Sequence, residues 1–213
     1  MPKGTPRKER TNSPRPPRGS SGYARKQPEG QMSGKLSITA KNGKQQFLLD
    51  SIQGSSITVV LGPAGTGKTY VSVKKAVQLL LSPGSHYKKI ILARSIIPTG
   101  KSMGYLPGDV TEKLVPWVLP MLSVIEDSVG KSHLEYLMAS NVVEIQPLET
   151  IRGRSFEDSI ILIDEAQNLD FEEIKAITTR LGEGSKMVLM GDAWQSDIRD
   201  GTPLLDFTMM CER

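Results

Sequence analysis

Five short runs of branched apolar residues constrain the fold of this 213-residue chain more than any other feature. They are ITVVL (57–61), KIILA (89–93), NVVEI (141–145), IILI (160–163) and KMVLM (186–190). Strands that are covered on both faces show this near-continuous apolarity, and sheets of such strands are usually parallel. The sequence therefore predicts an α/β fold in which helices sandwich a mostly parallel sheet.

Apolar residues at helical spacing lie between these runs. One amphipathic pattern starts at Val73, and another starts at Ile174, behind the capping box that Asp170 and Glu173 would form. Residues 95–140 are less regular. There, a kinked helix is expected around Pro116 and Pro120, and a short helix over 133–139 is expected from a capping box of Ser132 with Glu135.

Residues 1–34 differ in composition from the rest of the chain. They hold six of the fourteen prolines and five glycines, with almost no large apolar residues, so we expect a disordered tail ahead of a single domain over 35–213. Residues 1–30 carry eight Lys/Arg and two Glu, which is +6; the remaining 19 basic and 21 acidic residues give −2. The tail is either a solubilising segment or a basic arm that attracts nucleic-acid phosphates.

Several classes of protein are disfavoured by composition. Cys211 is the only cysteine, which excludes an intramolecular disulfide and agrees with a reducing cytoplasm. His86 and His133 have no second ligand at metal-binding spacing. No apolar run approaches the roughly 18 residues of a membrane span, so no membrane partner is expected.

The segment GPAGTGKT, Gly62–Thr69, matches the P-loop pattern and follows the first apolar run. Glycines let such a loop turn its N–H groups inward, so that the loop and the following helix N-terminus bind phosphate. Lys68 would reach the β- and γ-phosphates of ATP, and the Thr69 hydroxyl would coordinate Mg²⁺. The predicted nucleotide-binding residues of this segment are Gly62, Pro63, Ala64, Gly65, Thr66, Gly67, Lys68, Thr69 and Tyr70.

Two carboxylates end the run IILI. In a P-loop NTPase a second strand delivers a carboxylate to the Mg²⁺ shell, which makes Asp164 the candidate metal ligand. Glu165 is then the candidate general base for the attacking water. Without the P-loop, the same pair would be read as the solvated end of a strand.

A third polar strand end reads MGDAWQSD. Asp192 and Gln195 follow the run 186–190, and carboxyl ends of parallel strands are where doubly wound folds place ligands. Gln195 is predicted to contact the γ-phosphate or the lytic water.

Together, GPAGTGKTY, LPGDVTEKLVPW, EIQPLETIRGRSFEDSIILIDEAQN and RLGEGSKMVLMGDAWQSD resemble the PhoH family of P-loop ATPases, which is related to the nucleotide-binding lobe of superfamily-one helicases. The resemblance covers roughly residues 37–200. It implies a RecA-like sheet, ATP hydrolysis with Mg²⁺, a cytoplasmic location, and an association with phosphate starvation and RNA metabolism.

Residues carried over from the family agree with the motif assignments and add to them. Asp164, Glu165 and Gln167 match its DEAQ motif, and Gln45, 17 positions before Gly62 (62 − 45), resembles the glutamine that reads adenine. Three arginines also match family positions: Arg94, Arg152 and Arg154. The resemblance implies that they contact phosphate, contact RNA or act as an arginine finger in the site of a neighbouring subunit.

The chain departs from the family pattern in three places. Ser95-Ile96-Ile97-Pro98 replaces a PAVE-like stretch, Trp194 stands where a small residue is common, and the chain stops at Arg213, before a final strand segment. Two functions are open at this point. The first is an ATPase coupled to RNA or single-stranded nucleic acid, expected as a homo-oligomer such as a ring; the second is an ATP-dependent switch or scaffold without useful turnover.

Overall fold

The computed structural model contains a sheet of five parallel strands in the order β1-β5-β4-β2-β3. The strands are β1 (Ile57–Leu61), β2 (Lys89–Arg94), β3 (Val143–Ile145), β4 (Ser159–Asp164) and β5 (Lys186–Gly191). The structure describes residues 36–95, 110–192 and 203–211, which belong to one unit spanning Gln31–Arg213. The prediction of a parallel α/β sheet is confirmed.

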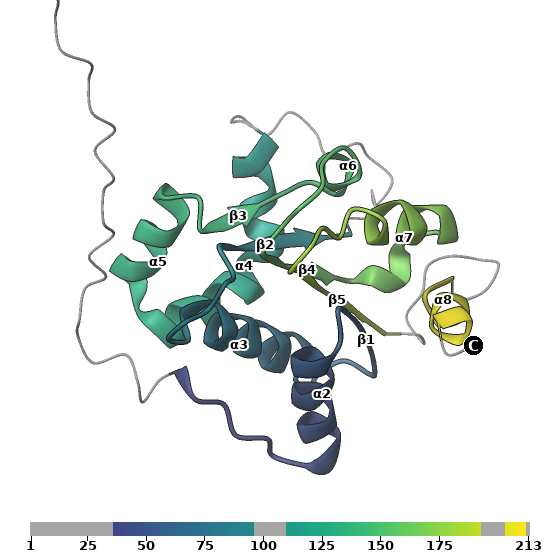
Figure 1. Ribbon diagram of the computed structural model, residues 1–213, viewed down its shortest axis with the longest axis horizontal. Helices are drawn as coiled ribbons and strands as arrows, with labels where there is room; N and C mark the ends of the chain where they lie inside the picture. The colour runs from purple at the N-terminus through teal and green to yellow at the C-terminus, as the bar shows by residue number, and fades with distance from the viewer. Residues whose placement is uncertain (1–35, 96–109, 193–202, 212–213) are drawn as a thin grey trace, which may run out of the picture. The chain divides into compact units, whose positions relative to one another are not determined.

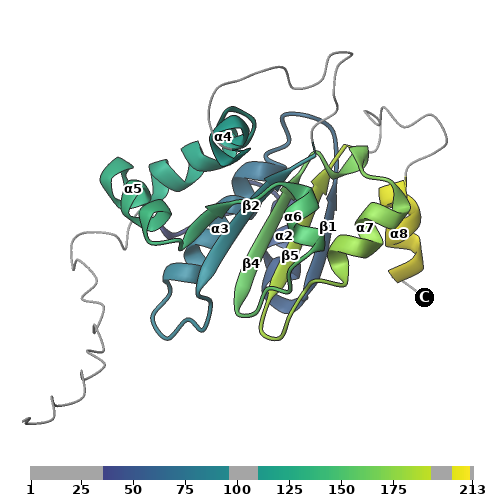
Figure 2. The same ribbon diagram turned by 90° about the horizontal axis from the view of Figure 1, so that it is seen from above.

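Helices cover both faces of the sheet (Figures 1 and 2). One layer contains α2 (Gly43–Gly54), α3 (Lys68–Leu81), α4 (Val110–Val129) and α5 (Lys131–Ala139). The opposite layer contains α6 (Leu148–Arg152), α7 (Phe171–Thr178) and α8 (Pro203–Cys211), and the short 3₁₀ helix η1 (Ala166–Asn168) follows β4. Within the described ranges, no helix combines the length and apolarity needed to cross a membrane.

Side chains alternate between two cores along β4, which explains the continuous apolarity of the central strands. Ile160 and Leu162 pack with the layer of α2 to α5, whereas Ile161 and Ile163 pack with the layer of α6 to α8. All four are fully buried. Burial of each such side chain stabilises the fold by about 1.5–3 kcal/mol, so a strand of this composition is stable only between two helical layers.

Several expected helices are present with changed boundaries. The capping box that starts α7 is confirmed, since Asp170 Oδ1 accepts from the Glu173 N–H at 2.7 Å. Helix α4 runs continuously through Pro116 and Pro120. The expected start of the next helix was wrong, because α5 begins at Lys131 behind Gly130, and the Ser132 side chain is not its cap.

Two elements were missed or misjudged at the sequence level. No helix is predicted from the sequence around Gln45, which lies in α2, where only Leu49 and Ile52 are buried. The third strand is shorter than the run 141–145, because Asn141 adopts a left-handed conformation with φ 55° and β3 starts at Val143.

The strand order determines how the predicted site assembles. Strand β5 lies between β1, which leads into the P-loop, and β4, which ends in Asp164. The Gly62 N–H donates to the Gly191 carbonyl at 3.3 Å, so the start of the loop is tied to the end of β5. All three carboxyl ends therefore meet at one edge of the sheet.

Candidate functional site

The loop Gly62–Thr69 curves between β1 and α3 with two residues in the left-handed region. Gly65 has φ +76° and Gly67 has φ +85°, conformations that glycine adopts without the steric cost of a Cβ atom. Gly67 is the N-cap of α3 and has no side chain to occupy the first N–H groups of that helix. The loop and helix end thus offer backbone donors and the positive end of the helix dipole to an anion.

Lys68 is folded back over the same loop. Its Nζ donates to the Gly62 carbonyl at 2.5 Å and to the Pro63 carbonyl at 2.9 Å. The Thr66 hydroxyl also donates to the Pro63 carbonyl, at 2.8 Å. The ammonium group is therefore held at the mouth of the loop, where an anion would lie.

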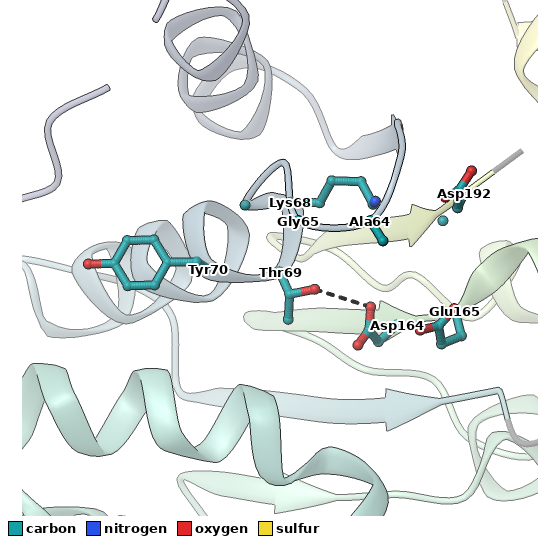
Figure 3. Close-up of a pocket in the computed structure, with 10 residues that line it drawn as sticks. Ala64, Gly65, Lys68, Thr69, Tyr70, Asp164, Glu165 and Asp192 are labelled. Atoms are coloured by element: carbon teal, nitrogen blue, oxygen red, sulfur yellow. Dashed lines mark hydrogen bonds between the residues drawn. The ribbon is translucent and has the colours of Figure 1, made fainter. Parts of the chain in front are cut away.

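Thr69 and Asp164 are in contact. The Thr69 hydroxyl donates to Asp164 Oδ1 at 3.3 Å, which joins α3 to the end of β4 (Figure 3). Burial raises the pKa of the Asp164 carboxyl above its ordinary value. The Arg94 guanidinium opposes that shift, and the neighbouring Glu165 carboxylate reinforces it. A cation beside Asp164 would favour its ionised form.

Glu165 follows β4 in a left-handed conformation, with φ 54° and ψ 37°. This conformation costs a non-glycine residue roughly 1–2 kcal/mol, and it turns the chain sharply into η1. Two side chains hold the carboxylate. Arg94 Nη2 lies 3.1 Å from Oε1, and the Gln167 amide donates to Oε2 at 2.5 Å.

Gln167 links the acidic pair to the neighbouring strand end. The side chain is buried, and its Oε1 accepts from the Asp192 N–H at 3.1 Å, just after β5. A Cβ atom at Gly191 would lie 3.0 Å from the same oxygen, so glycine is needed for this close approach. Gly191 was not among the predicted site residues, since a strand-end glycine gives no signal without its neighbours.

Both predicted acids and six of the predicted residues of Gly62–Tyr70 line a cavity of about 330 Å³ at the carboxyl edge of the sheet (Figure 3). Its lining combines the P-loop, the acidic pair and the end of β5: Ala64, Gly65, Gly67, Lys68, Thr69, Tyr70, Asp164, Glu165, Gly191 and Asp192. Tyr70 points away from the acidic pair and is half exposed. Gln195 lies outside the described residues.

A second cavity of about 610 Å³ lies on the other side of the P-loop, against the start of α2. Gln45 lines this cavity, and its Nε2 donates to the Thr66 carbonyl at 3.4 Å. Asn42 is the N-cap of α2, accepting from the Gln45 N–H at 3.0 Å. The spacing of Asn42 and Gln45 is that of a capping box, a signal that could have revealed α2 from the sequence.

The three candidate arginines have different surroundings. Arg94, at the end of β2, contacts both acids, with Nη1 3.8 Å from Asp164 Oδ2. Arg152 pairs with Glu173 at the start of α7. Arg154 lies 3.9 Å from Glu144 and 5.3 Å above the Phe156 ring, and neither Arg152 nor Arg154 lines the cavity of the acidic pair.

The described part of the chain contains no cluster of three His, Cys, Asp or Glu side chains able to hold a metal by themselves. The donors present, the Thr69 hydroxyl and the Asp164 carboxylate, are nevertheless the hard oxygen ligands that Mg²⁺ accepts alongside water and nucleotide phosphates. These residues fit a magnesium ion bound together with a nucleotide.

The sequence matches a known protein family and several proteins of that family. The family described as PhoH-like protein matches residues 37–207. A PhoH-like protein of Bacillus subtilis is 42% identical over 165 residues, which is 78% of this chain and 51% of the relative. A PhoH-like protein of Mycobacterium tuberculosis is 39% identical over 77% of this chain and 46% of its own length.

Protein PhoH of Escherichia coli is 34% identical over 166 residues, covering 77% of this chain and 46% of the relative. The chain thus spans about half the length of the relatives that it matches. On the extent of these matches, the chain belongs to the PhoH-like protein family.

Proposed function

We propose that this protein binds ATP with Mg²⁺ and hydrolyses it at the cavity of the acidic pair. The observation that carries the proposal is the contact of Thr69 with Asp164 beside Lys68, with Glu165 one residue further along the chain. A glycine-rich turn or a solvated strand end would not bring a hydroxyl, an ammonium and two carboxylates to one cavity. A phosphate-binding and water-activating site uses this set of groups.

Each group has a defined role in this proposal. The N–H groups of the loop and Lys68 bind the phosphates, and Thr69 and Asp164 hold Mg²⁺. A magnesium ion bound there would neutralise negative charge on the phosphate oxygens. Glu165 accepts the proton of the attacking water, and Gln195 contacts the γ-phosphate or that water.

The adenine ring is assigned to the second cavity, beside Gln45. This cavity adjoins the loop through Gly62, Pro63 and Thr66, so a nucleotide can extend from one cavity to the other along the P-loop. Two backbone groups hold the Gln45 amide there: its Nε2 donates to the Thr66 carbonyl at 3.4 Å and its Oε1 accepts from the Lys41 N–H at 2.9 Å, and adenine would exchange with these partners. An amide that both donates and accepts can pair with adenine.

Hydrolysis is further proposed to be coupled to RNA or single-stranded nucleic acid in the cytoplasm. The +6 charge of residues 1–30 and the resemblance to helicase nucleotide-binding lobes support this. We also propose a homo-oligomer, because Arg152 and Arg154 lie away from the cavity of their own chain and could serve a neighbouring one. Light scattering with ATP and Mg²⁺ tests this; monomers that hydrolyse ATP contradict it.

Phosphate release by the purified protein tests the coupling. The rate is measured alone and with single-stranded RNA, duplex RNA and single-stranded DNA, at two salt concentrations. We expect single-stranded RNA to raise the rate, more at low salt, and Lys68→Ala to remove the release in every condition. Release that no nucleic acid changes contradicts the coupling and leaves ATP hydrolysis standing.

A second function has one observation in its favour. Both carboxylate oxygens of Glu165 are engaged, by Arg94 and Gln167, as expected of an acid that is fixed by its neighbours in a nucleotide-dependent switch. A protein that binds ATP with Mg²⁺ but releases no phosphate, with or without nucleic acid, would support the switch and contradict turnover.

A further inference from the structure

Arg94 connects the acidic pair to a helix on the other side of the guanidinium group. Its Nη2 lies 3.1 Å from Glu165 Oε1, and its Nη1 donates to the backbone carbonyl of Trp117 in α4 at 3.0 Å. About a quarter of the side chain is exposed, 23% of its area. One side chain at the end of β2 therefore bonds both to α4 and to Glu165, just after β4.

The contact on α4 lies in a turn that prolines have altered. Pro120 has no N–H to donate to the Pro116 carbonyl, so this turn of the continuous helix lacks one backbone hydrogen bond. Arg94 approaches the same turn at Trp117. Neighbouring residues on α4 face two ways: Val118 and Met121 are buried, whereas Trp117 and Leu119 are 40% and 54% exposed.

The contact with Arg94 limits how the Glu165 carboxylate can be oriented. Oε2 is held by Gln167, which is buried and bonded in turn to the Asp192 N–H. Rotation of the carboxylate would therefore lengthen one of its two bonds. Gln167 belongs to η1 and is fixed with the acid, whereas Arg94 is also fixed to α4, so the Arg94 bond is the one that a shift of α4 would change.

We propose that Arg94 is a positioning residue that couples the placement of α4 to the orientation of the Glu165 carboxylate. The inference rests on the proposed role of Glu165 as the base. Arginine suits this task because its planar fork directs N–H groups to two acceptors at once. A lysine keeps the charge but, as a point charge on a flexible stem, does not hold both acceptors in fixed geometry.

The test compares Arg94→Lys and Arg94→Gln with Lys89→Gln, which removes an ion pair with Glu144 at the opposite end of the same strand, β2. All are made in a Trp194→Phe background, which leaves Trp117 as the sole tryptophan, and circular dichroism checks folding. Steady-state hydrolysis gives kcat and KM for ATP. Trp117 emission is recorded without nucleotide and with ATP and Mg²⁺.

Both Arg94 variants are expected to lower kcat by about 10- to 100-fold with KM changed less than about threefold, because binding groups stay in place while the base is misplaced. The nucleotide-dependent change in Trp117 emission should disappear in both Arg94 variants and persist in Lys89→Gln. A merely structural role for Arg94 would not remove the emission change while nucleotide still binds.

Arg94 variants that hydrolyse ATP at the parental rate, or whose Trp117 emission still responds to ATP, overturn the inference while the proposed function stands. A parental protein that binds ATP but releases no phosphate contradicts the proposed function instead. A change in KM alone also overturns the inference, because it would make Arg94 a nucleotide-binding group.

Discussion

The hydroxyl of Thr69 lies 3.3 Å from the Asp164 carboxylate although the two residues are 95 positions apart in the chain. The strand order brings them together, since β5 alone separates the strand before the P-loop from the strand that ends in Asp164. The contact unites the two halves of the proposed nucleotide site in a single α/β sheet. The following predictions test the groups around it.

Gln45→Ala should weaken the discrimination of ATP from GTP. Its amide lies in the cavity assigned to the base, and loss of one hydrogen bond corresponds to about 1 kcal/mol, or somewhat under tenfold in affinity. Competition binding of ATP against GTP measures the ratio. Gln46→Ala is the matched control, because the Gln46 amide bonds to Asp50 instead. Unchanged selectivity in Gln45→Ala would remove the adenine assignment.

Gly191→Ala should destabilise the protein by about 1–3 kcal/mol through overpacking. The added Cβ would lie 2.8 Å from a Leu204 methyl group and 3.1 Å from the backbone nitrogen of Gln167. Urea unfolding measures the loss. Gly43→Ala is the control, since its Cβ would meet nothing within 4 Å and helix propensity favours alanine by up to about 1 kcal/mol. Equal stability of the two variants would contradict the packing described at the end of β5.

Asp164→Asn should raise the stability of the nucleotide-free protein at neutral pH while removing hydrolysis. Burial raises the pKa of Asp164 above 3.8, its ordinary value. At a pH between 3.8 and the raised pKa, the folded protein therefore binds more protons than the unfolded chain. Stability therefore falls as pH rises through that range, and the asparagine variant should lack this fall. Urea midpoints from pH 3 to pH 7, with a metal chelator present, measure it.

Asp158→Asn is a control in which stability should depend on pH in the opposite direction. The hydrogen bond from Lys88 lowers the pKa of Asp158, so its contribution to stability is present above pH 3.8 and is lost as pH falls. Asparagine also tolerates the left-handed conformation at this position, φ 48°. A urea midpoint for Asp164→Asn below that of the wild type at neutral pH would show that the ionised carboxylate does not destabilise the folded protein.

The sequence predicted most of the fold because its central strands must be buried on both faces. The runs at 57–61, 160–163 and 186–190 appear as strands with ends shifted by at most one residue. Helix α2 was missed because only Leu49 and Ile52 are buried, so its apolar periodicity is weak. In that helix the cap at Asn42 carried more information than the periodicity.

Side chains of the candidate site were predictable where a motif fixes their spacing, as for Lys68 and Thr69. The partners of Glu165 were not, because Arg94 faces Asp164 only through the register of β2 against β4. That register has no signature in the order of residues along the chain. Gly191 was missed for the same reason, since its close neighbours come from η1 and α8.

The most direct test of the central claim is phosphate release by Glu165→Gln beside the wild type. Glutamine keeps the shape of the side chain but cannot accept a proton from water, so the rate should fall by about 100-fold or more while ATP and Mg²⁺ still bind. Equilibrium binding of ATP to both proteins supplies the control. A variant that releases phosphate at the wild-type rate would contradict the assignment of Glu165 as the base.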